Sequence, residues 1–220
     1  MKGTDVYSKS LLLLIAVDFI ALVPGARAQQ REAGILGGGG FMNGSALRGA
    51  STPVTAGFSP GPAVGVLIGH DLYSHWSGEI RYVFEEQDAR LRSSGITAGF
   101  AAQAHVLNYD LVLHARPRQD RVRPYIAVGG GIKIFRGTGA EVAYRPLMDY
   151  AYLTRTQELK PMLTLGGGVK FRLGRRMMAR IDFRDQLTRF PHKVIQPAPG
   201  MTLNGWLHDF VPTVGVSWVF

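Results

Sequence analysis

The sequence predicts an all-β protein: an eight-stranded antiparallel up-and-down transmembrane β-barrel. In the last residues, Phe210 to Phe220, apolar side chains alternate with small or polar ones, so the two faces of a strand differ. Eight segments of about ten residues show such alternation. The connections between them are alternately long and short. Because an open sheet edge would leave backbone groups unpaired in hydrocarbon, such strands cross a membrane only as a closed barrel.

Residues 1–28 have the features of a secretory signal peptide. Two lysines precede an apolar run over residues 10–23, and Ala26-Arg27-Ala28 supplies a cleavage motif. A retained transmembrane anchor is the weaker alternative, because Asp18 interrupts the run and about 20 apolar residues are needed to span a membrane. We therefore expect residues 29–220 to form one outer-membrane barrel domain, with export through the periplasm.

The alternating segments give the expected strands in order. They are 31–42, 62–71, 75–85, 101–114, 122–135, 160–173, 177–187 and 209–220. The connections at 43–61, 86–100, 136–159 and 188–208 are long, and those at 72–74, 115–121 and 174–176 are short. Tight periplasmic turns and long external loops are typical of outer-membrane barrels. Both termini are therefore expected in the periplasm and four loops outside.

The seventh segment indicates which face points inward. Met177, Ala179, Ile181 and Phe183 alternate with Arg180, Asp182 and Arg184. An arginine facing lipid at mid-membrane costs roughly 2–4 kcal/mol, so the charged face is expected in the lumen. Asp185 lies on the apolar face and is tolerable only near the outer interface. In the fourth segment, the polar Gln103 and His105 suggest a bulge or emergence from the membrane.

The same assignment for every strand predicts a charged lumen. Its members are Glu79, Arg81, Asp110, Lys133, Lys170, Arg172, Arg180, Asp182, Arg184 and Asp209. The interior of an eight-stranded barrel is just wide enough for side chains to fill. An unpaired buried ion costs several kcal/mol, so we expect these side chains to form ion pairs. A narrow, low-conductance channel is the alternative.

Two glycine-rich segments, 123–137 and 160–174, resemble each other without gaps. Neither has the GxxxxGK[ST] spacing of a phosphate-binding loop. We expect their glycines to face a narrow interior and to make room for long side chains.

Aromatic residues are expected at both membrane interfaces, as in the girdles of transmembrane barrels. Trp76, Phe171 and Trp218 fall at the periplasmic rim, and Tyr82, Phe84 and Phe210 at the opposite rim.

These features resemble the small eight-stranded outer-membrane β-barrels of Gram-negative bacteria, which include opacity-type surface proteins and the outer-membrane protein A-like barrel domain. The signal peptide, the loop alternation, the GGG-containing strands and the C-terminal GVSWVF carry the resemblance. It implies that the barrel assembly machinery reads the last strand through Val214, Val216, Trp218 and Phe220. It also implies a monomer in contact with outer-membrane lipid and lipopolysaccharide.

The long loops are the expected carriers of function, because loops on a rigid scaffold commonly bind ligands. The candidate contact residues are Tyr144, Arg145, Tyr150, Tyr152, Arg155, Phe190, His192, Lys193 and Trp206. Tyrosine, tryptophan and arginine often anchor interfaces. We expect a structural or surface-interaction role, adhesion-like in character, with an unspecified extracellular ligand. Solvated loops over lipopolysaccharide headgroups are the alternative interpretation.

A lipid A-modifying enzyme is the rival hypothesis. His75-Trp76-Ser77 resembles the His-x-Ser pairing of lipid A deacylases, with Glu79 as a candidate orienting acid. The predicted topology places this motif at the periplasmic end, away from the outer leaflet. His192, His208 and Asp209 are weaker candidates for a metal site. We therefore expect no catalytic residues, no metal site and no cofactor.

Composition agrees with these expectations but does not reveal the membrane. The chain has no cysteine, a mean hydropathy of +0.04 and a net charge of +9. Without a disulfide or thiolate site, pairing and packing must hold the fold. A basic surface attracts anionic lipids, and no nucleic-acid partner is expected. A soluble lipocalin-type barrel is the alternative fold, but it would require a polar exterior.

Overall fold

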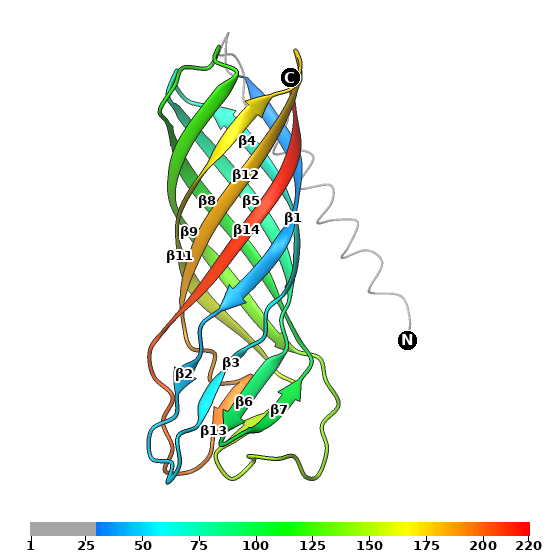
Figure 1. Cartoon of the computed structure of the whole chain (residues 1–220), viewed down its shortest axis with the longest axis vertical. Helices are drawn as coiled ribbons and strands as arrows, with labels where there is room; N and C mark the ends of the chain where they lie inside the picture. Colours follow the sequence, from blue (N-terminus) through cyan, green and yellow to red (C-terminus); the bar gives the residue numbers. More distant parts are fainter. Residues whose placement is uncertain (1–29) are drawn as a thin grey trace, which may run out of the picture.

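The computed structural model describes residues 30–220, so the predicted signal peptide and Gln29 lie outside the described residues. Eight strands close into an antiparallel barrel in the order β1-β14-β12-β11-β9-β8-β5-β4 (Figure 1). They are β1 (Arg31–Met42), β4 (Gly61–Asp71), β5 (Trp76–Glu86), β8 (Ala102–His114), β9 (Val122–Gly137), β11 (Gln157–Arg172), β12 (Met177–Arg189) and β14 (Trp206–Val219). This architecture confirms the predicted fold class.

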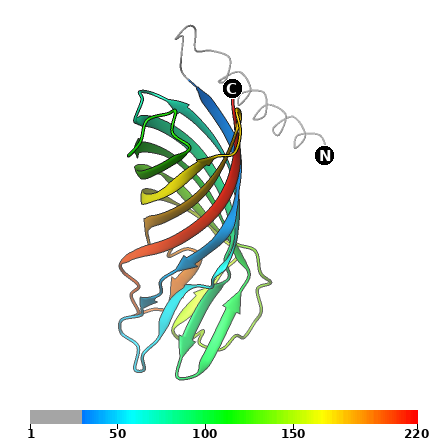
Figure 2. The same cartoon turned by 45° about the horizontal axis from the view of Figure 1, so that its top comes forward.

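The barrel is strongly staggered. A path along directly paired residues, from Arg31 through all eight strands, returns to β1 at Phe41, ten residues further along. Stagger and strand tilt are linked, and barrels of this kind have tilts of about 35–45°. Figure 2 shows the tilt as strands that wind around the barrel axis. Closure leaves the barrel wall without a free edge.

The predicted strands differ from the observed ones by at most three residues, at the starts of β11 and β14. The predicted bulge near Gln103 is wrong. The β5–β8 pairing runs without a slip from Trp76↔Leu113 to Glu86↔Gln103. His105 instead lies on the outer face, where its Nδ1 is 2.8 Å from the Tyr82 hydroxyl. The position of His105 fits the second expectation for the fourth segment, that the strand leaves the membrane near Gln103 and His105.

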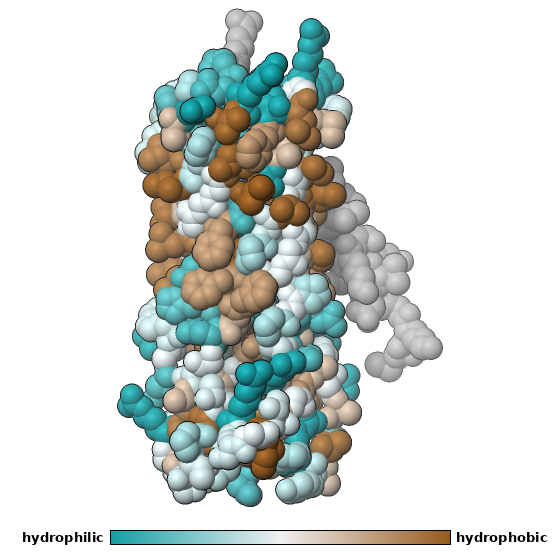
Figure 3. Space-filling model, viewed as in Figure 1, coloured by the Kyte–Doolittle hydropathy of each residue, from teal (hydrophilic) through white to brown (hydrophobic). Residues whose placement is uncertain are grey.

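The outer face of the barrel is apolar. Exposed side chains there include Ile35, Val64, Val66, Ile68, Ile80, Leu107, Ile126, Val128, Leu163, Leu165, Ile181, Phe183, Val214 and Val216. Figure 3 shows apolar residues on the barrel wall and more polar surface around its rims. An exposed apolar surface this extensive marks contact with a membrane or a partner. Within residues 30–220, no helix is long and apolar enough to span a membrane.

The long connections form more regular structure than the sequence suggested. We call residues 43–60, 87–101, 138–156 and 190–205 the cap, which lies at the end of the barrel opposite the C-terminus (Figure 1). Strands β2 (Ser45–Ala46), β3 (Thr55–Phe58), β6 (Ala89–Ser93) and β7 (Ile96–Phe100) form one sheet. Strands β10 (Ala151–Leu153) and β13 (Ile195–Pro197) form a second.

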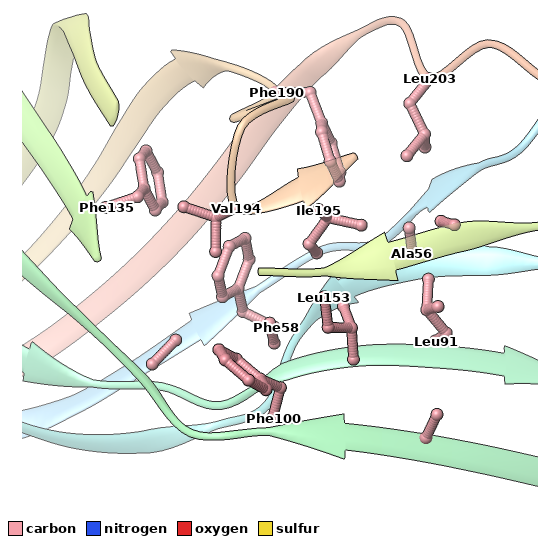
Figure 4. Packing of buried hydrophobic residues seen from close by; sticks show 14 of the residues in the cluster. Ala56, Phe58, Leu91, Phe100, Phe135, Leu153, Phe190, Val194, Ile195 and Leu203 are labelled. Atoms are coloured by element: carbon pink, nitrogen blue, oxygen red, sulfur yellow. The ribbon is translucent and has the colours of Figure 1, made fainter. Parts of the chain in front are cut away.

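A hydrophobic core joins the cap to the mouth of the barrel. Figure 4 shows aromatic and aliphatic side chains meeting there, among them Phe58, Phe100, Phe135, Phe190, Leu153 and Ile195. The prediction that Phe190 is a surface contact is wrong, because its side chain is only 1% exposed. Burial of a phenylalanine stabilises the cap by about 1.5–3 kcal/mol.

We expect Val214→Arg, on the lipid-facing side of β14, to destabilise the barrel by roughly 2–4 kcal/mol, because the charge would enter hydrocarbon. The measurement is equilibrium unfolding in lipid vesicles, with boiled and unboiled gel mobility as a check of folding. The matched control is Val142→Arg at an exposed cap position. Equal stability of the two variants would contradict the assignment of the outer face.

Candidate functional site

The barrel lumen, on the side away from the cap, holds an ion network with equal numbers of positive and negative side chains. Its cations are Arg81, Lys170, Arg180 and Arg184, and its carboxylates are Glu32, Glu79, Asp110 and Asp182. All eight residues are buried. Buried ions persist only when opposite charges and hydrogen bonds replace their water. Equal numbers of the two charges meet this requirement.

The ion pairs are branched. Lys170 Nζ lies 2.6 Å from Glu32 Oε2 and 2.7 Å from Glu79 Oε1. Arg180 contacts Glu79 at 2.9 Å through Nη2 and Asp182 at 2.6 Å through Nε. Each of these cations therefore links carboxylates from different strands. The network consequently connects the barrel wall across its interior.

Asp182 continues this network toward the cap. Its Oδ1 is 3.3 Å from Arg81 Nη1 and 3.0 Å from Arg184 Nη1. Arg184 Nε in turn lies 3.1 Å from Asp110 Oδ2. The Tyr125 hydroxyl also donates to Asp182, and the Arg180 guanidinium carbon lies 5.6 Å from the Tyr125 ring centroid. An aromatic face attracts such a cation, so Tyr125 is part of the network.

Glycines provide space for these side chains. A Cβ at Gly166 would lie 2.7 Å from Arg184 Cδ, and one at Gly129 would lie 2.3 Å from Asp110 Oδ1. At both positions the Cβ would also lie 2.1 Å from a backbone carbonyl oxygen of the neighbouring strand, so a larger residue would disturb the strand pairing as well as the charged neighbour. The expectation that the glycine-rich strands make room for side chains in the lumen agrees with these distances.

A second ion cluster lies nearer the cap. Lys133 Nζ is 2.6 Å from Glu85 Oε2 and also contacts Asp209. Gln186 accepts from Lys133 at 3.1 Å, and its amide nitrogen donates to Glu85 at 3.1 Å. Gln87 donates to Asp209 at 3.2 Å. Two carboxylates thus share one ammonium group, and neutral amides complete their hydrogen bonding.

An apolar layer separates the two sets of charges. It consists of Ala63, Val83, Val106, Met162 and Val211. On β5, Val83 occupies the inward position between Arg81 and Glu85. The lumen is therefore filled in successive layers: the ion network, the apolar layer, the Lys133 cluster and the cap core.

One predicted member of the lumen network is misplaced. Arg172 is half-buried, and its guanidinium donates to the Arg118 carbonyl rather than to a lumen carboxylate. It lies at the end of β11, where the chain leaves the barrel. Glu32 was missed, although the alternation of β1 would place it on the inward face with Leu36. Tyr125 and Gln186 also belong to the lumen contacts, but they carry no charge, so the pattern of charged residues did not indicate them.

The predicted interface aromatics follow the two ends of the apolar surface. Trp76 and Trp218 are exposed near the barrel termini, and Phe171 is half-buried there. Tyr82 and Phe210 are exposed nearer the cap. Phe84 is half-buried beside His105, with ring centroids 5.3 Å apart. Val214, Val216 and Phe220 are exposed at the end of the chain, together with Trp218.

The His75–Ser77 pairing is wrong. Ser77 is buried, and its Oγ is 3.0 Å from His114 Nε2, whereas His75 Nδ1 is 3.0 Å from Ser74 Oγ. His75 lies in the turn just before β5, whereas Ser77 lies on the buried inner face of that strand, so the two side chains have different hydrogen-bond partners. Glu79 is engaged by Lys170 and Arg180 and is not available as an orienting acid.

The three residues of the candidate metal site are engaged separately. His208 Nδ1 lies 2.8 Å from Asp185, whereas Asp209 contacts Lys133 and His192 Nε2 contacts the Leu203 carbonyl. Across residues 30–220, no group of histidines and carboxylates has the arrangement of a metal site. Pairing with His208 accounts for the acidic Asp185 on the outer barrel face.

The remaining predicted contact residues belong to the cap or its junction with the barrel. Tyr144, Tyr152, Arg155, His192, Lys193 and Trp206 are exposed. Arg145 is half-buried, with its guanidinium carbon 4.9 Å from the Phe100 ring centroid. Tyr150 packs against the cap core, and hydrogen bonds from Thr52 and Ser51 lower the pKa of its phenol. The exposed set therefore surrounds a folded core.

No protein-family model and no curated protein matches the sequence. Among solved structures, Neisserial surface protein A (NspA) gives a TM-score of 0.51 at 10% identity, over 89% of this chain and 99% of that chain. The N-terminal barrel domain of Pseudomonas aeruginosa OprF gives 0.46 at 13% identity, over 87% and 97% respectively. Yersinia pestis Ail, solved with the heparin analogue sucrose octasulfate, gives 0.41 at 10%, over 86% and 99%.

The chain therefore has the fold of the small eight-stranded outer-membrane β-barrels. At these identities, the similarity concerns the fold alone.

We expect Lys133→Met to destabilise the protein by about 3–5 kcal/mol, because it leaves Glu85 and Asp209 buried without their cation. Equilibrium unfolding in detergent measures this change. The matched control is Lys160→Met, which removes a more exposed pair with Glu158 and is expected to cost at most about 1 kcal/mol. If both variants lose equal stability, the Lys133 cluster has no special role.

Proposed function

We propose that this chain is an integral outer-membrane protein whose closed barrel displays the cap as a structural or surface-interaction element, adhesion-like in character. The folded core beneath the exposed Tyr144, Tyr152 and Trp206 is the observation that supports this role most directly. A surface that is already ordered loses less conformational entropy on binding. The cap is consequently better suited to recognition than four independent loops would be.

The proposed orientation places the short turns and both mature ends in the periplasm and the cap outside the cell. Export would begin with the signal peptide over residues 1–28. The barrel assembly machinery would read the exposed side chains of the last strand, Val214, Val216, Trp218 and Phe220. The barrel would function as a monomer surrounded by outer-membrane lipid and lipopolysaccharide.

The layered lumen argues against the channel hypothesis. Ions would have to displace paired charges, pass the apolar layer around Val83 and then cross the core below the cap. Separating a buried ion pair costs several kcal/mol. The geometry therefore favours a closed barrel.

We expect the purified protein to show no discrete conductance in planar bilayers, because its lumen is filled. Arg81→Ala and Arg184→Ala provide a second check, since neutralising a pore-lining charge would shift the conductance of a channel. Reproducible single-channel steps that change in either variant would support the channel instead.

The lipid A-modifying enzyme has less support from the geometry. Ser77 and His114 form a hydrogen-bonded pair inside the barrel, but His114 Nδ1 has no hydrogen-bond partner in the described part of the chain. A nucleophile activated by histidine usually also requires a group that orients the histidine. The pair is therefore better explained as part of the lumen packing. His75→Ala should leave the acyl chains of lipid A unchanged.

The surface role can be tested by comparing the two ends of the molecule. We expect Tyr144→Ala and Trp206→Ala to weaken binding of nanodisc-embedded protein to an array of glycans and extracellular-matrix proteins. Loss of an aromatic interface anchor often costs about 2 kcal/mol or more, roughly a thirtyfold loss of affinity.

The matched control is Tyr73→Ala at the opposite end, where the side chain is 72% exposed, close to the 79% of Tyr144. It should leave binding unchanged. The proposal fails if the array captures the protein no better than empty nanodiscs, or if all three variants behave alike.

A further inference from the structure

Two arginines share a hollow where the barrel meets the cap. The hollow has a volume of about 220 Å³ and is lined by Arg136, Gly137, Thr138, Arg155, Thr156 and Gln157. It lies between the end of β9 and the start of β11. Two guanidinium groups, two hydroxyls and one amide give it mainly hydrogen-bond donors and positive charge.

The arginines are not neutralised by the protein. Within residues 30–220, neither the Arg136 nor the Arg155 side chain has a carboxylate or hydrogen-bond partner. This contrasts with the lumen, where Arg180 contacts several carboxylates. Like charges placed together without a counterion favour binding of an anion.

The nearby acidic groups already have partners. Glu141 accepts the Arg155 backbone N–H at 2.8 Å, and Glu158 lies 2.7 Å from Lys160 Nζ. Glu158 also accepts the backbone N–H of Lys193 at 2.7 Å. The Thr156 hydroxyl donates to the Lys193 carbonyl at 2.6 Å, so the backbone next to the hollow belongs to another basic residue. The surroundings therefore do not remove the excess of positive charge.

The position of the hollow indicates the source of the anion. Arg136 is directly paired with Gln103 and Gln157 in a row of polar residues on the outer face. Two positions further from the cap on both strands, the paired Ile134 and Leu159 belong to the apolar outer face, and Leu159 is 54% exposed. The hollow consequently begins where the apolar surface ends, at the level of lipid headgroups.

We infer that this hollow binds a phosphoryl group on the sugar head of an outer-leaflet glycolipid. The two guanidinium groups supply paired N–H donors of the kind that match phosphate oxygens. Thr138 and Gln157 add neutral donors, and the lipid chains lie along Ile134 and Leu159. This site goes beyond the proposed surface role, since it fastens the base of the cap to the membrane that surrounds it.

The test uses the full mature chain, folded in detergent, and native mass spectrometry with bisphosphorylated lipid A as the probe. We expect Arg136→Gln combined with Arg155→Gln to weaken binding at least about tenfold, because the substitutions remove charge-assisted hydrogen bonds to the phosphate oxygens, which are stronger than neutral ones. The matched control is Arg90→Gln combined with Arg92→Gln, which removes the same charge from β6 of the cap and should change binding less than about twofold. Unboiled gel mobility verifies that each variant is folded.

Two further probes identify the source. Dephosphorylated lipid A should bind the original protein and the Arg136/Arg155 variant equally weakly, and inorganic phosphate should compete only at high concentration. The inference is overturned if the two double variants bind alike, if removing the phosphates has no effect, or if only a soluble sulfated saccharide binds. None of these results depends on the array experiment, so the two proposals can fail separately.

Discussion

Pairing of buried charge in a narrow lumen is the constraint on which the rest of the structure depends. Eight strands enclose a space that side chains must fill, and inward positions of these strands carry charges. Glu79, held between Lys170 and Arg180, shows how the cost of burial is offset. Because Lys133, Lys170 and Arg180 each join carboxylates from different strands, the same contacts that satisfy the charges also fix the barrel cross-section.

Because the lumen is filled, contacts with other molecules fall to the ends and the outer wall of the barrel. The apolar layer around Val83 separates the balanced network from the Lys133 cluster, and the cap core covers the mouth. A filled interior is a poor path for solutes but a rigid support. The cap can therefore hold Tyr144 in place, and the start of β14 holds Trp206, while the proposed Arg136–Arg155 site lies where the cap meets the barrel wall.

In the cap, long connections form an ordered structure because they share one hydrophobic core. Phe58, Phe190 and Ile195 come from different connections, yet all contribute to one core. Such side chains are separated by long stretches of sequence, and each connection alone buries too little apolar surface to be ordered. Together they provide enough burial for two small sheets. The barrel brings these connections together because its strands run alternately up and down, which places every second connection, and so all four, at the same end.

The sequence by itself determined the strands, their alternation and which face carries charge, because the two-residue period of a strand is a local property. It predicted most members of the lumen set, such as Arg180 and Asp182, from that period alone. Tertiary structure decided the contacts of individual side chains. Arg172 donates to a backbone carbonyl, Ser77 hydrogen-bonds to His114 instead of His75, and Phe190 is buried. These outcomes depend on strand register and on contacts between distant loops, which a local pattern does not contain.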